Sequence, residues 1–213
     1  MNRIAVLACA ALVAGILVTP ASAGVIVVQG SSAPVYATTL NFDEPGGPTG
    51  ANVPNNSWAG APWGITEFQS GAGNNFVGDI SPYTGQTTNS YYGPYGVFIK
   101  FSQDLTEMSF DAWDTSGPPS PFGGGMAVVL LNDGDEFNPV YFNSFTPAIA
   151  GTGLPSFNIT TDSGTVFDEV RILGFGFFPE TVVDNLSWNA IPEPGSLSLL
   201  ALGIVGLMRR RVK

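Results

Sequence analysis

Short apolar runs with strand-like alternation recur along this chain. Residues 107–112 alternate, with Met108, Phe110 and Ala112 apolar and the positions between them polar. A period of two predicts a half-buried strand. Residues 126–131 are apolar throughout, which is typical of a central strand covered on both faces. No long segment has helical periodicity, and we predict strands at residues 25–28, 36–42, 65–68, 76–80, 96–101, 106–113, 126–131, 140–145, 156–160, 166–173 and 182–188.

Clusters of turn-forming residues separate these runs. Pro45-Gly46-Gly47-Pro48 and Gly123-Gly124-Gly125 are two of them. About ten short strands joined by turns favour an antiparallel β-sandwich or jelly-roll-like fold. The fold class expected is therefore all-β, with a single domain at residues 24–190.

The first 23 residues have the layout of a secretory signal peptide. Arg3 precedes an apolar run at residues 4–18, Pro20 breaks that run, and Ala21-Ser22-Ala23 follows. A basic start, a short apolar core and small residues before the cleavage bond are what a signal peptidase recognises. We expect a signal-peptide helix cleaved after Ala23; the alternative is an uncleaved anchor or a buried helix.

A second apolar segment, at residues 195–208, carries no charge and is followed by Arg209-Arg210-Arg211. As a helix, 14 residues span roughly 21 Å, less than the roughly 30 Å of a bilayer's hydrocarbon core. The three arginines form a basic stop, typical of a segment held on the cytoplasmic side. We expect a short transmembrane helix that is retained briefly, and a buried core helix is the alternative.

Residues 191–213 resemble the PEP-CTERM sorting signal. The resemblance rests on Pro192-Glu193-Pro194, on the apolar segment and on Arg209-Arg210-Arg211, which come in the order of that family. It implies a bacterial protein that is exported, held in the inner membrane and processed by an exosortase, in systems associated with exopolysaccharide and biofilm. Gly195 departs from the Ser or Thr that is frequent in the family, which leaves the cleavage bond open.

Trimming both ends changes the charge and the available chemistry. Only Lys100 and Arg171 remain as bases against sixteen acids, a net charge of about −14. Nucleic-acid binding is excluded because neutralising phosphate requires Lys and Arg. Cys9 is lost with the signal peptide, and the chain has no His. Catalysis by Ser-His-Asp or Cys-His groups and His-ligated zinc are therefore excluded.

The densest acidic group surrounds a Gly turn. Asp133, Asp135 and Glu136 are the calcium candidates, because Ca²⁺ takes several carboxylate oxygens. Their spacing does not match an EF-hand loop. A solvated hairpin turn is the other reading, since Asp-Gly is a strong turn signal.

Asp184 shares the strand parity of Val182, Leu186 and Trp188, so it falls on an apolar face. A carboxylate there needs polar partners. We expect it to accept hydrogen bonds from backbone amides, with cation binding as the alternative.

Aromatic residues in Gly- and Pro-rich segments are candidates for stacking on sugars, because their flat faces suit such ligands. Trp58 and Trp63 are the main ones, and several of these rings could instead cover the ends of the sandwich. The full set is Trp58, Trp63, Tyr83, Tyr91, Tyr92 and Tyr95. No spacing selects a catalytic carboxylate pair, and we predict no enzyme and no catalytic residues.

The closing run Val183-Asp184-Asn185-Leu186-Ser187-Trp188 is similar to the last strand of jelly-roll carbohydrate-binding modules. The function expected is that of an exported surface or extracellular-matrix protein, structural or adhesive, associated with exopolysaccharide or biofilm. A calcium-dependent carbohydrate-binding module is the alternative, and a secreted glycan-active enzyme is a third. The expected partners are signal peptidase, an exosortase-type enzyme, exopolysaccharide and, transiently, the inner membrane.

Overall fold

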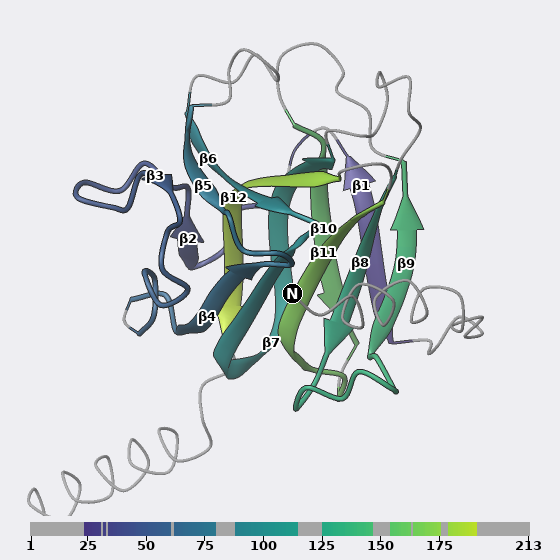
Figure 1. Cartoon of the computed structure of the whole chain (residues 1–213). Coiled ribbons are helices and arrows are strands. Elements are labelled where there is room, and N and C mark those ends of the chain that lie inside the picture. Colours follow the sequence, from purple (N-terminus) through teal and green to yellow (C-terminus); the bar gives the residue numbers. More distant parts are fainter. Residues whose placement is uncertain are drawn as a thin grey trace, which may run out of the picture.

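The computed structural model describes residues 24–30, 32, 34–60, 62–79, 88–114, 125–146, 154–162, 164–175 and 179–190. Strands are the regular elements in this part of the chain (Figure 1). They are β1 (Val25–Gly30), β2 (Thr38–Leu40), β3 (Gly50–Ala51), β4 (Ile65–Ser70), β5 (Phe76–Asp79), β6 (Asn89–Pro94), β7 (Val97–Asp114), β8 (Gly125–Leu131), β9 (Tyr141–Phe145), β10 (Ser156–Thr161), β11 (Phe167–Phe175) and β12 (Glu180–Ala190).

Every pair of these strands is antiparallel, and together they form one open hydrogen-bonded sheet. The main path is β3-β5-β6-β12-β7-β11-β8-β9, with β1 joined through β10 to β7, β2 joined to β12, and β4 joined to β7. The prediction of an all-β, antiparallel fold is confirmed. The finer prediction of a sandwich or jelly roll stays a prediction.

Strand β7 organises the sheet because its two halves have different neighbours. Residues 97–101 pair with β4 and β11, whereas residues 107–114 pair with β10 and β12. Leu105, between the two halves, is in register with both β11 and β12. The sequence predicted two strands here, at 96–101 and 106–113, and the structure has one strand of 18 residues. The polar stretch between the halves contains no Gly or Pro, so the chain stays extended. The register with β4 and β11 shifts there instead.

Two strands were missed by the sequence prediction, β3 and β6. Strand β6 lies in the segment of Tyr91, Tyr92 and Tyr95, which the sequence analysis described as rich in Gly and Pro. It nevertheless pairs with both β5 and β12. Gly93 is required by a close backbone approach, since a Cβ there would lie 2.8 Å from the Gly96 carbonyl oxygen. Gly93 therefore allows tight packing at the end of a strand.

The core joins strands that do not pair with each other in the sheet. Ring contacts join strands that are not hydrogen-bonded to each other: Phe68 of β4 lies 4.5 Å from Tyr91 of β6, and Phe145 of β9 lies 5.3 Å from Phe157 of β10. The predicted apolar face of β7 is confirmed, because Met108, Phe110 and Ala112 have no exposed surface. All seven residues of β8 are buried, as predicted for a central strand.

Both terminal helices that the sequence predicted, the signal-peptide helix at residues 1–23 and the hydrophobic helix at 195–208, lie outside the described residues. Within the residues that the structure does describe, no helix is both long enough and apolar enough to cross a membrane.

Candidate functional site

The prediction that Trp58 stacks on sugars is wrong. Its side chain is 1% exposed and belongs to the core. The ring lies 5.3 Å from Phe42 and 5.0 Å from Phe68, centroid to centroid, and Tyr91 closes the group. Aromatic rings prefer such edge-on and tilted contacts when they pack together. The Gly- and Pro-rich segment that contains Trp58 folds inward and fills the core with this ring.

Trp63, the second sugar-stacking candidate, is half-buried and packs against the same core. Its indole N–H donates to the Thr39 carbonyl oxygen at 3.2 Å. Tyr91 is fully buried, whereas Tyr95 is 50% exposed, and Tyr83 lies outside the described residues. Sugar stacking at Trp63 stays a prediction, and Phe137, 90% exposed, is an exposed ring that the sequence analysis missed.

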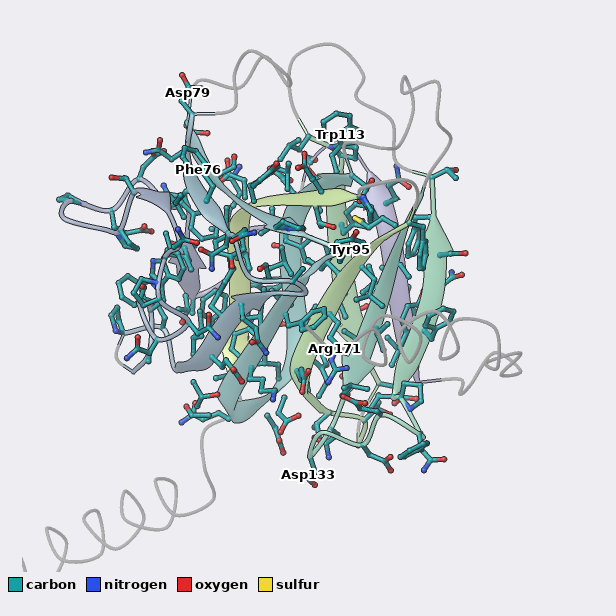
Figure 2. All side chains as sticks on the ribbon, viewed as in Figure 1. Phe76, Asp79, Tyr95, Trp113, Asp133 and Arg171 are labelled. Carbon is teal, nitrogen blue, oxygen red and sulfur yellow. The ribbon has the colours of Figure 1, made fainter. Side chains whose placement is uncertain are left out.

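The predicted turn at residues 132–136 is confirmed. The Asp135 N–H donates to the Asn132 carbonyl oxygen at 3.2 Å, and the two residues between them, Asp133 and Gly134, have φ of 55° and 70°. Positive φ at both central positions is what an Asp-Gly hairpin turn uses. Figure 2 shows Asp133 at one end of the molecule, beyond the ends of the strands.

Two of the three calcium candidates, Asp135 and Glu136, have carboxylates with separate partners. Asp135 accepts from the side-chain amide of Asn138 at 3.0 Å and from the N–H groups of Phe137 and Asn138. These bonds, led by the Asn138 side chain, lower the pKa of Asp135. Glu136 instead pairs with Arg171 at 2.7 Å. The described residues contain no group of three His, Cys, Asp or Glu placed to hold a metal ion. Calcium binding at Asp133, Asp135 and Glu136 stays a prediction.

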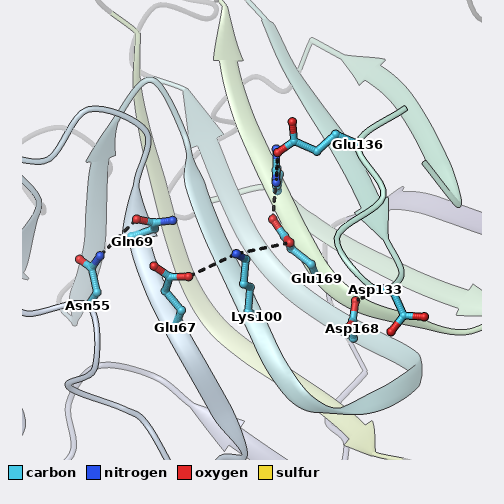
Figure 3. Close-up of polar contacts among 9 residues, drawn as sticks. Asn55, Glu67, Gln69, Lys100, Asp133, Glu136, Asp168 and Glu169 are labelled. Carbon is cyan, nitrogen blue, oxygen red and sulfur yellow. Dashed lines mark hydrogen bonds and ion pairs between the residues drawn. The ribbon is translucent and has the colours of Figure 1, made fainter. Parts of the chain in front are cut away.

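A row of alternating charges crosses the sheet, and we call it the charge ladder: Glu67, Lys100, Glu169, Arg171 and Glu136. Figure 3 labels its members other than Arg171. The Lys100 ammonium lies 3.3 Å from Glu67 on β4 and 3.9 Å from Glu169 on β11. These three residues are directly opposite one another in the strand register. Opposite charges at such cross-strand positions stabilise a sheet.

Arg171 continues the ladder from β11. Its guanidinium pairs with Glu169 on its own strand and with Glu136 in the turn. It also lies over the Phe98 ring, 5.2 Å from the centroid, in a cation–π contact. Lys100 and Arg171 are the only basic residues between residues 24 and 190, and both form ion pairs with carboxylates. An acidic polymer therefore finds no unpaired base among the described residues of the domain.

The sequence analysis missed the ladder. Glu169 is only 2% exposed. Its burial is possible because Lys100 and Arg171 both compensate its charge. Composition could have indicated the ladder, because the only two basic residues of the domain, Lys100 and Arg171, both fall on predicted strands.

Asp184 lies at an irregular point of β12, directly opposite Asp111 of β7. Its carboxylate accepts from the Asn185 N–H at 2.7 Å, which confirms the predicted backbone role, and from the hydroxyls of Thr88 and Ser90. The side-chain amide of Asn185 donates to Asp111 at 2.8 Å. Asn185 has φ of 49°, so the left-handed backbone at this bulge directs both of its donors at the two acids.

Burial, reinforced by the charge of Asp111, raises the pKa of Asp184 to about 7, against the lowering effect of its hydrogen bonds. A carboxyl with a raised pKa is a candidate general acid where substrate can reach it. Asp184, however, has no exposed surface. Its oxygens are occupied by Asn185, Thr88 and Ser90. This arrangement orders the ends of β6, β7 and β12 and offers no opening to a ligand.

The predicted processing residues all lie outside the described residues: Ala21, Ala23, Pro192, Glu193, Pro194, Arg209, Arg210 and Arg211. The structure does describe Ala190, the residue from which the C-terminal tail continues. Ala190 ends β12 and is in register with Leu105 of β7. Pro192 therefore follows the closing strand with one residue between them.

Residues 190–212 match the family model described as the PEP-CTERM protein-sorting motif. No curated protein and no solved structure matches the chain. The match begins at Ala190, the last residue of β12, and includes Pro192-Glu193-Pro194 and the three arginines. It marks an exported protein that is sorted by an exosortase-type enzyme. The chain thus carries a PEP-CTERM sorting motif, which begins at the last strand of an antiparallel β domain.

Proposed function

We propose that this protein is a structural or adhesive component of the cell surface or extracellular matrix, associated with exopolysaccharide or biofilm. The observation that carries the proposal is the sorting motif at residues 190–212, which starts where the β domain ends. A domain that is delivered outside the cell by such a tail is the cargo of the sorting system. The proposed route runs through signal peptidase, a transient stay in the inner membrane and release or attachment at the surface.

The proposed role is non-catalytic. The polar side chains that stand out in the domain are engaged with one another: the charge ladder joins β4, β7 and β11, and the Asp111–Asp184 pair joins β7 and β12. These contacts favour a rigid module. The ring contacts between Phe68 and Tyr91 and between Phe145 and Phe157 support a jelly-roll-like sandwich folded along β7.

The test follows the protein through the cell in its own host. The variant P192A/E193A/P194A removes the motif's processing element, and V35A, a change at an exposed residue of the β domain, is the matched control. We expect the wild type and V35A in the surface or matrix fraction and the motif variant in the inner-membrane fraction. Mass spectrometry of the exported wild type should find a C-terminus close to residues 192–195.

Two further outcomes bear on the role itself. Loss of matrix cohesion or of surface attachment in a strain without this protein would support the structural or adhesive role. Turnover of polysaccharide by the exported protein would overturn the non-catalytic role. Recovery of the intact residues 209–213 on the surface protein would overturn processing.

A further inference from the structure

Strand β1 borders the sheet with an apolar and uncharged sequence. It pairs with β10 along its whole length, and no other described strand pairs with it. Its sequence, VIVVQG, contains no charge and no proline. Ile26 and Val28 are 63% and 54% exposed, on the side away from the core. Soluble proteins usually protect such an edge with Lys, Pro or a bulge, because an open apolar edge pairs with other strands.

The backbone groups that point away from β10 can be assigned from the register. The Gly24 carbonyl oxygen accepts from the Asp162 N–H at 2.7 Å, and the register places these two residues opposite each other. Hydrogen-bonded and non-hydrogen-bonded residues alternate along an antiparallel strand. Ile26, Val28 and Gly30 therefore bond to β10. The N–H and C=O groups of Val25, Val27 and Gln29 point to the open side.

We propose that the open edge of β1 is a self-association surface, on which a second copy of this chain adds its own β1 antiparallel, centred on Val27. This register pairs Val27 with Val27 and Val25 with Gln29 of the other copy. It matches all three outward donors and all three outward acceptors of each strand. No other antiparallel register of β1 on itself does so.

The same register matches the exposed side chains. Ile26 of one copy comes opposite Val28 of the other, twice, at the non-hydrogen-bonded positions where side chains approach most closely. Both residues are exposed in the single copy. Val25 and Val27 already pack against the core and extend that side of the sheet. A two-fold rotation exchanges the two copies and maps the contact onto itself, as an isologous dimer requires.

Because β1 is complementary to itself in this register, a second copy of the chain is favoured over another protein as the binding partner. This pairing also gives a distinctive salt dependence. Each domain carries a net charge of about −14, so the two copies repel each other while the paired strands themselves are uncharged. Screening by salt weakens the repulsion and leaves the apolar contact and the backbone bonds in place. Dimerisation should therefore strengthen as salt is raised from about 0.01 M to about 1 M.

The test uses the exported protein as the cells release it, in sedimentation velocity over a concentration series. We expect a monomer–dimer equilibrium. Hydrogen exchange at low and high protein concentration identifies the surface, because an amide exchanges slowly when it is hydrogen-bonded. The amides of Val25, Val27 and Gln29 should gain protection in the dimer. Those of Ile26, Val28 and Gly30, already bonded to β10, should be protected in both states.

Variants distinguish association through the edge of β1 from nonspecific association. I26K and V28K put a charge against an apolar side chain of the other copy, and each should weaken dimerisation by about tenfold or more. V35K is the matched control: Val35 is 81% exposed and lies outside β1. It should leave dimerisation unchanged. A protein that stays monomeric at all concentrations, a dimer that I26K and V28K leave intact, or protection without the alternation would each overturn the proposal.

Discussion

Asp184 of β12 faces Asp111 of β7 across a bulge, and Asn185 donates one hydrogen bond to each of them. Two carboxylates at directly opposed positions repel when both are charged. Full burial of Asp184 adds a desolvation cost to its charged form. The pair is therefore held with Asp184 protonated below neutral pH, and its amide and hydroxyl partners order three strands around it.

The stability of the domain should fall as the pH rises through this titration. The pKa of Asp184 is raised from 3.8 to about 7, chiefly by burial. Between these values the folded protein keeps a proton that the unfolded chain has released. The contribution is thus fully present below about pH 4 and is lost by about pH 7, amounting to a few kcal/mol.

The measurement is the free energy of unfolding in denaturant, taken from pH 4 to pH 8, for the wild type, D184N and D111N. D184N removes the titrating group, and its stability relative to the wild type should increase with pH over this range. D111N removes the neighbouring charge, lowers the pKa of Asp184 and so should reduce the loss. An identical pH dependence in D184N and the wild type would contradict the assignment.

The charge ladder makes a second prediction, which separates buried from exposed ion pairs. The Glu169 side chain is 3% exposed and that of Glu67 is 34% exposed, yet both pair with Lys100. Glu169→Ala leaves Lys100 and Arg171 without their shared partner and should cost about 3 kcal/mol. Glu67→Ala removes a partly exposed pair and should cost less than about 1 kcal/mol. Urea unfolding measures the loss of stability in both variants. Equal losses would contradict the prediction that the buried ion pairs of Glu169 contribute more than the exposed pair of Glu67.

The parts of the fold that the sequence predicted are those set by local pattern. Alternation along residues 107–112 placed Met108 and Phe110 in the core, where the structure has them. The missed features depend on pairing between distant segments. Lys100 and Glu169 meet only because β7 and β11 pair in one register. Such a contact leaves no trace in local periodicity.

The candidate site was harder to predict than the fold because its residue types have two uses. A Trp in a loop-like segment suits a sugar surface and a core equally, and only the packing of Phe42, Phe68 and Tyr91 around Trp58 decides between them. The sorting motif could be predicted, because a short linear motif is encoded by its own neighbouring residues.

The two tryptophans should differ sharply in their effect on stability. Trp58→Ala empties a fully buried position and should cost about 3 kcal/mol or more. Trp63→Ala removes a half-buried ring and one hydrogen bond, and should cost about 1 kcal/mol. Urea unfolding followed by far-UV circular dichroism gives both values without relying on Trp fluorescence. A small cost for Trp58→Ala would contradict its place in the core.

Calcium should leave the stability of the turn at residues 132–136 unchanged. Asp135 accepts hydrogen bonds from Asn138 and Phe137, and Glu136 pairs with Arg171, so these two carboxylates point at separate partners. A cation that binds only the folded protein must raise its melting temperature. We therefore expect no change in melting temperature when calcium is added and then chelated, in the wild type or in D135N. D135N should be less stable than the wild type under both conditions, because it loses acceptor strength toward the turn. A calcium-dependent rise in the wild type that D135N abolishes would instead place a calcium site at this turn and favour the carbohydrate-binding alternative.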